Sequence, residues 1–157
     1  MKTFTLSILL ASATLSACSL FTDSPDENSS LNSTITTDGM AFTLSVPTTS
    51  FAQSDTLKLT FQVSNNSNVA KEFNFSNVQQ LGFRLTDWFG RTALSHPNIV
   101  SPALSAFVLQ PGESNVLSIS RLFRDYNGQS VARGSYRLSA YLLDGNSPPV
   151  SLQISVN

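Results

Sequence analysis

The chain has 157 residues, of which 41% are hydrophobic and only 12% are charged, and its formal net charge is −1. This length suits one domain of ordinary size, and the charge offers no basic patch of the kind that binds nucleic acid. With one histidine and one cysteine, the chain lacks the residues for most metal sites and catalytic triads, so we expect no metal ion and no cofactor. The low charged fraction favours antiparallel β-sheet with one solvated face.

The N-terminus has the pattern of a secretory signal. Lys2 gives it a positive start, and residues 4–15 form an apolar stretch shorter than the roughly 20 residues of a membrane-spanning helix. The stretch ends in Leu15-Ser16-Ala17-Cys18, which resembles the lipobox of bacterial lipoproteins. The resemblance implies cleavage between Ala17 and Cys18 and attachment of lipid to Cys18. The alternative is an ordinary signal peptide that ends near a cysteine by chance.

Lipid on Cys18 would make the membrane the first partner of this chain. Two or three acyl chains anchor a protein firmly, because each buried CH₂ contributes about 0.8 kcal/mol. Enterobacterial lipoproteins that stay in the inner membrane usually carry Asp directly after the lipidated cysteine, whereas residue 19 here is Ser. By that resemblance, and for a Gram-negative source, Ser19 predicts a bacterial envelope protein anchored in the outer membrane.

The sequence divides into a signal peptide at 1–17, a flexible acidic linker at 18–38 and a folded domain at 39–157. The linker has four acidic residues, no basic ones and few apolar ones, so we expect it not to fold alone. In the domain, apolar and polar residues alternate as they do in strands with one buried face. The strand-like runs are 42–46, 57–63, 73–75, 81–85, 117–119, 136–142 and 150–156. A further short apolar run lies at 106–109.

Turn signals separate the runs. Among them are Asn65-Asn66, Phe89-Gly90, Pro111-Gly112, Asn127-Gly128 and Asp144-Gly145. No window after the signal peptide has the spacing of a capped helix. Seven to nine short strands with one apolar face each predict an immunoglobulin-like antiparallel β-sandwich. The antibody-type disulfide core is excluded, because the domain has no cysteine pair.

No catalytic motif is present, and we expect no enzyme activity. His96 is the only imidazole and precedes Pro97 in an expected loop, where a solvated histidine is more common than a catalytic base. The carboxylates show neither the spacing of a glycosidase pair nor that of a calcium loop. Four arginines between residues 121 and 137 predict either a basic patch for an anionic partner or solvated faces of two neighbouring strands. They are Arg121, Arg124, Arg133 and Arg137.

Five short motifs occur in an order that resembles the BsuPI family of intracellular proteinase inhibitors. They are Phe61-Gln62-Val63-Ser64-Asn65, Phe73-Asn74-Phe75-Ser76, Phe83-Arg84-Leu85-Thr86-Asp87, Leu109-Gln110-Pro111-Gly112-Glu113-Ser114 and Gly134-Ser135-Tyr136-Arg137-Leu138-Ser139-Ala140-Tyr141-Leu142. The resemblance implies a sandwich fold and a proteinase as partner. An inhibitor of this kind presents a rigid loop to the partner's cleft.

Two loops are candidates for that contact, the turn at 87–91 and the segment at 95–103. Their candidate contact residues are Trp88, Phe89, Arg91, His96, Pro97 and Asn98. The alternative role for Trp88 and Phe89 is to cover one open end of the sandwich, since large aromatic residues usually pack.

A second function also fits the sequence, namely a non-inhibitory accessory lipoprotein that binds another envelope protein. Such a protein can add a partner's strand to an exposed sheet edge. Solvent exposure separates the two functions: exposed Trp88 and Phe89 favour recognition by a loop, and buried ones weaken it.

Overall fold

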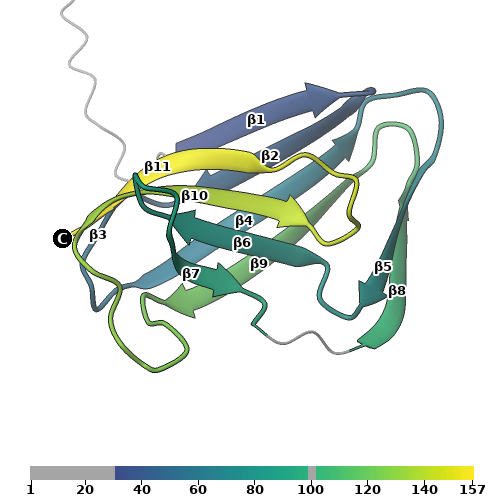
Figure 1. Cartoon of the computed structure of the whole chain (residues 1–157). Coiled ribbons are helices and arrows are strands. Elements are labelled where there is room, and N and C mark those ends of the chain that lie inside the picture. The colour runs from purple at the N-terminus through teal and green to yellow at the C-terminus, as the bar shows by residue number, and fades with distance from the viewer. Residues whose placement is uncertain (1–30, 99–101) are drawn as a thin grey trace, which may run out of the picture.

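A computed structural model of the chain describes residues 31–98 and 102–157, which fold into an all-β structure (Figure 1). The predicted signal peptide and the Ala17-Cys18 site lie outside the described residues. The described strands are β1 (Leu31–Thr37), β2 (Met40–Val46), β3 (Ser50–Phe51), β4 (Thr56–Asn65), β5 (Lys71–Asn77), β6 (Leu81–Thr86), β7 (Thr92–His96), β8 (Pro102–Leu109), β9 (Ser114–Leu122), β10 (Gly134–Leu142) and β11 (Val150–Val156).

Two sheets pack face to face, which confirms the predicted β-sandwich. One has the order β1-β2-β4-β9 and the other has the order β3-β11-β10-β6-β7, while β5 and β8 form a separate ribbon. Neighbouring strands are antiparallel, apart from the short parallel pairing of β3 with β11. Eleven strands are described, against seven to nine predicted. The strands without a predicted run are β1, the two-residue β3 and β7, in which Leu94 is the one fully buried residue.

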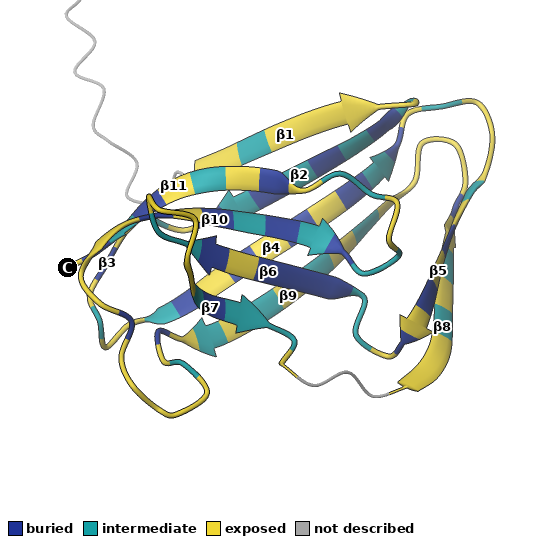
Figure 2. Cartoon of the chain, in the orientation of Figure 1, coloured by how far each residue is buried: buried dark blue, intermediate teal, exposed yellow. Residues whose placement is uncertain are grey.

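The core lies between the sheets and follows the period-two pattern of the sequence (Figure 2). In β4, Leu57, Leu59, Phe61 and Val63 are buried, and the residues between them face solvent. Phe83 and Leu138 of the facing sheet belong to the same core cluster. Full burial of such side chains contributes about 1.5–3 kcal/mol each, so alternation in the sequence is sufficient to select the buried face.

The folded unit includes residues that the sequence places in the linker. Residues 31–37 form β1, which pairs along its whole length with β2. The prediction of a linker over 18–38 is therefore wrong for this part. The strand carries only two large apolar residues, Leu31 and Ile35, which stay 44% and 37% exposed at the sheet edge. Because so little of β1 is buried, its sequence resembles that of a solvated segment.

Buried Asn65 fastens two turns to the end of β4. Its amide nitrogen donates hydrogen bonds to the carbonyl oxygens of Val69 and Leu109, at 2.8 and 2.9 Å. Its side-chain oxygen accepts from the Ser67 backbone N–H and hydroxyl, at 3.0 and 2.7 Å. The backbone of Asn65 also bonds to Gly112 and Glu113. One amide thus connects the end of β4 with the turns on either side of it.

A tyrosine fastens the start of β10. The Tyr136 hydroxyl donates a 2.7 Å hydrogen bond to the carbonyl oxygen of Ala132, four residues earlier, as in the tyrosine corner of immunoglobulin-like sandwiches. Burial raises the pKa of Tyr136 above its ordinary value of 10.0, and nearby Asp87 adds to the rise. The hydroxyl therefore keeps the proton that it donates.

Candidate functional site

The turn between β6 and β7 is held by one carboxylate. Asp87 Oδ1 accepts hydrogen bonds from the backbone N–H groups of Phe89 and Arg91, both at 2.9 Å. Asp87 Oδ2 forms an ion pair with Arg91 Nε at 2.6 Å. Gly90 has φ of +79°, a conformation that glycine adopts without strain. The sequence Asp87–Arg91 therefore encodes a braced turn.

Trp88 and Phe89 project from this turn into solvent. Their side chains are 86% and 81% exposed, so the alternative in which they cover an open end of the sandwich is wrong. The Arg91 guanidinium lies 5.2 Å from the centroid of the Phe89 ring, within the range of a cation–π contact. Two large apolar side chains thus stand on a turn whose backbone is fixed.

The electrostatics of Asp87 reinforce the brace. Partial desolvation acts to raise the pKa of Asp87, but hydrogen bonds from the Arg91 N–H and guanidinium and from the Phe89 N–H more than offset this. The pKa of the carboxyl is therefore lowered from its ordinary value of 3.8. Asp87 is ionised near neutral pH, and the turn keeps its ion pair there.

The second candidate segment begins at the last residue of β7. His96 is half-buried and its ring stacks on Phe83, with centroids 6.1 Å apart, whereas the sequence places it in a solvated loop. Burial lowers the pKa of His96 from 6.5, and the charge of Arg121 lowers it further. The His96–Pro97 peptide bond is cis, and Asn98 is exposed. Residues 99–101 of the predicted loop lie outside the described residues.

The structure does not bring the two candidate segments together. The turn at Asp87–Arg91 precedes β7 and the segment at His96–Asn98 begins at the last residue of β7, so they lie at opposite ends of that strand. A five-residue strand separates its ends by about 14–17 Å. Among the residues that the structure describes, no group of three or more His, Cys, Asp or Glu side chains is placed to hold a metal ion.

The four clustered arginines do not lie on two neighbouring strands. Arg121 belongs to β9 in one sheet and Arg137 to β10 in the other, while Arg124 and Arg133 lie in the loop between them. Sequence reasoning missed this arrangement because sequence distance does not say which sheet a strand joins. It also missed Tyr126 of the same loop, whose hydroxyl lies 2.9 Å from that of Ser95.

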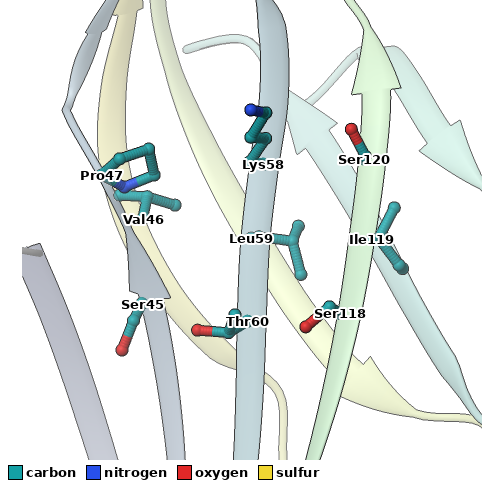
Figure 3. A pocket seen from close by; sticks show the side chains of 9 residues that line it. All are labelled: Ser45, Val46, Pro47, Lys58, Leu59, Thr60, Ser118, Ile119 and Ser120. Atoms are coloured by element: carbon teal, nitrogen blue, oxygen red, sulfur yellow. The ribbon is translucent and has the colours of Figure 1, made fainter.

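A shallow hollow of about 650 Å³ lies along β2, β4 and β9 (Figure 3). Register places Ser45, Thr60 and Ser118 in one row across these strands, with Lys58 and Ser120 in the next row. Lys58 is the single charged side chain among the nine that line it. Four hydroxyl side chains and one ammonium, set among four apolar side chains, offer no acid–base pair for catalysis.

The described residues thus form a β-sandwich whose braced β6–β7 turn carries two exposed aromatic side chains. A family model described as BsuPI, intracellular proteinase inhibitor, matches residues 42–147. The match spans well over half of the chain, and this protein belongs to the BsuPI family. The resemblance seen in the sequence motifs is thereby confirmed. No curated protein matches the chain.

Several solved structures share a similar arrangement of strands. A β-glucosidase from Erythrobacter marinus is 16% identical with a TM-score of 0.46, and the alignment covers 82% of this chain and 16% of that one. A β-glucosidase from Listeria innocua is 15% identical with a TM-score of 0.43 and the same coverage. The CARDB domain of a Pyrococcus furiosus protein is 14% identical with a TM-score of 0.42, over 73% of this chain and 84% of that one. This chain spans about a sixth of the two β-glucosidases.

Proposed function

We propose that this chain is a bacterial lipoprotein, held to a membrane by lipid on Cys18, whose BsuPI domain binds and inhibits a proteinase. The observation that carries the proposal is the family match over residues 42–147, which takes in all strands from β4 to β10. The membrane anchor is supported by the Leu15-Ser16-Ala17-Cys18 motif and by the absence of any other cysteine. Within the described part of the chain, no helix is long and apolar enough to cross a membrane.

Exposure of Trp88 and Phe89 supports contact through a loop rather than through a strand edge. Aromatic and arginine side chains are the residues that most often dominate protein interfaces. A braced loop also loses little conformational entropy on binding. The two candidate loops stand at opposite ends of β7, and we propose that one of them enters the proteinase cleft.

The test uses residues 18–157 with Cys18→Ser, which contain every described strand of the sandwich. This protein is titrated into a panel of serine proteinases while peptide hydrolysis is followed. The proposal predicts a sharp equivalence point, with the titrated protein left uncleaved. No inhibition across the panel at micromolar protein would contradict proteinase inhibition for these enzymes and leave the anchor to be tested separately.

Paired substitutions then identify the loop. One pair is Trp88→Ala with Phe89→Ala, and the other is Pro97→Ala with Asn98→Ala. Truncating the residues that dominate an interface weakens binding by about 30-fold or more. We expect one pair to weaken inhibition by this amount and the other pair to leave it nearly unchanged, so each pair is the control for the other.

The anchor has its own test. Full-length protein and its Cys18→Ala variant are produced in bacteria supplied with labelled palmitate, and membranes are separated from soluble protein. We expect label and membrane association for the full-length protein and loss of the label for the variant. Unlabelled full-length protein would contradict lipidation whatever the proteinase assay shows.

One observation favours the accessory function as a second candidate. β1 is an edge strand without charged residues or proline, the features that usually protect such edges. A partner strand paired with β1 would cover the exposed parts of Leu31 and Ile35. Thr34→Pro would block such pairing, and this function predicts loss of a partner that the loop variants still bind.

A further inference from the structure

The turn with Trp88 and Phe89 lies at the end of the sandwich where the described chain begins. The first residue of β1, Leu31, pairs with Val46, and the connection that follows β2 leads to Ser50, which pairs with Ser155 near the end of β11. Thr86, just before the turn, pairs with Arg137 near the start of β10. Figure 1 shows these segments and the β9–β10 loop together, away from β5 and β8. We call this the aromatic end, formed by residues 47–55, 86–91 and 122–137.

The aromatic end also holds four of the five exposed arginines among the described residues, and the fifth, Arg84, lies in the middle of β6. Arg124, Arg133 and Arg137 are exposed there, beside Arg91 of the turn. Arg91–Asp87 is the one ion pair among the described residues, so the other three guanidinium groups have no carboxylate within ion-pair distance. Arg124 and Arg133 make only long contacts with neutral oxygens, at 3.4 and 3.5 Å.

The opposite end has the other sign of charge. The turns and strand ends there carry four carboxylates, with Lys71 as their neighbouring cation. These carboxylates are Asp38, Glu72, Glu113 and Asp144. The aromatic end holds four arginines and three carboxylates, Asp55, Asp87 and Asp125, so it has a small cationic excess, whereas the opposite end has an acidic excess.

We infer that the aromatic end is a lipid-contacting surface that rests on an anionic bilayer. Tryptophan and phenylalanine enter the boundary between headgroups and acyl chains. Arginine side chains extend an apolar stem and place a guanidinium at the phosphate level, and basic residues near an anionic surface add to the affinity. Trp88 and Phe89 supply the first contribution, and Arg124, Arg133 and Arg137 supply the second.

The position of the anchor agrees with this orientation. Twelve residues lie between Cys18 and Leu31, and even when fully extended the chain from one to the other spans no more than about 45 Å. The inference rests on the proposed function, namely on the lipid anchor at Cys18, only for this orientation of the domain. The contact of the aromatic end with lipid itself needs no acyl chain on Cys18. It assigns the turn to lipid and leaves the segment at His96–Asn98 for the proteinase.

Trp88 is the only tryptophan of the chain, so its fluorescence reports directly on the inferred contact. Residues 18–157 with Cys18→Ser are mixed with vesicles made of equal parts phosphatidylcholine and phosphatidylglycerol, or of phosphatidylcholine alone. We expect a blue shift with the anionic vesicles, quenching of Trp88 by brominated acyl chains, and weaker binding at high salt, which screens the arginines. An unshifted spectrum with anionic vesicles would overturn the inference.

Variants test the two contributions separately. Arg124→Gln with Arg133→Gln should weaken vesicle binding by about fivefold for each arginine, whereas the matched pair Lys71→Gln with Arg84→Gln should have little effect. Phe89→Ala should weaken binding by about tenfold, and Leu104→Ala, at a side chain that is 92% exposed on β8, should not. Equal losses in both pairs would mean unspecific attraction and would overturn the inference.

The proteinase titration separates this inference from the proposed function. Lipid contact predicts that Trp88→Ala with Phe89→Ala weakens co-sedimentation with vesicles and leaves inhibition unchanged. If the same pair abolishes inhibition and leaves co-sedimentation unchanged, the turn belongs to the proteinase contact and the lipid surface is refuted. The inhibition measured for the Pro97→Ala with Asn98→Ala variant is independent of vesicle binding. Proteinase inhibition and lipid contact can therefore each be contradicted without the other.

Discussion

Asn65 illustrates how a single polar side chain holds the loops of this domain. Replacing it with alanine would remove the amide donor from the carbonyl oxygens of Leu109 and Val69, of which Val69 keeps a 3.0 Å bond from the Ser67 hydroxyl, and would remove both bonds from Ser67 to the amide oxygen. Buried polar groups that lose a partner cost about 1–3 kcal/mol each. We therefore expect Asn65→Ala to lower the free energy of unfolding by about 2–4 kcal/mol, measured by urea denaturation. Exposed Asn66→Ala is the control, and equal losses for the two variants would contradict this role.

His96 makes stability depend on pH in a defined direction. Its pKa is lowered in the folded protein by burial and by Arg121, so protons bind the unfolded chain more readily. The contribution of His96 is complete above its ordinary pKa of 6.5 and is lost as the pH falls through the lowered value. Thermal midpoints at about pH 7.5 and about pH 5.5 should differ less in His96→Gln than in the natural chain. An unchanged difference would contradict the assignment.

At the scale of elements, the Asp87 carboxylate should control the order of the whole β6–β7 turn. The pKa of Asp87 is lowered by its hydrogen bonds. The contribution of Asp87 to stability is therefore present above its ordinary pKa of 3.8 and is lost as the pH falls through its pKa in the folded protein. Asp87→Ala should reduce the fluorescence anisotropy of Trp88 at neutral pH and lower the thermal midpoint. Asp144→Ala, which alters an aspartate-held turn at the opposite end, should leave the anisotropy intact.

Most strands were predictable because their pattern has a direct physical cause. In β2, β4 and β10, every second residue is buried, and such a face appears in the sequence as strict alternation. β1 was missed because its position at the edge leaves both of its large apolar residues partly exposed. Two-residue β3 is too short to show any period, and only its pairing with Ser155 and Val156 defines it.

At the scale of the whole molecule, the candidate site was predictable only in its parts. The turn at Asp87–Arg91 and its aromatic residues follow from local sequence. Whether the Trp88 side chain packs over the core or projects into solvent depends on how the strands are arranged around the turn. The local sequence does not contain that arrangement. The position of Arg137 beside this turn likewise requires the register of β10 on β6, which pairs Arg137 with Thr86. The separation of the turn from His96 follows from the direction of β7.

One sedimentation experiment tests membrane anchoring and proteinase inhibition together. Membranes from bacteria that produce the full-length protein, or its Cys18→Ala variant, are incubated with each proteinase of the panel and collected by centrifugation. The account predicts that at least one proteinase leaves the supernatant and sediments, inhibited, with membranes that carry the natural chain, but not with those from the variant. Proteinase that stays active in solution beside membranes proven to contain the protein would contradict it.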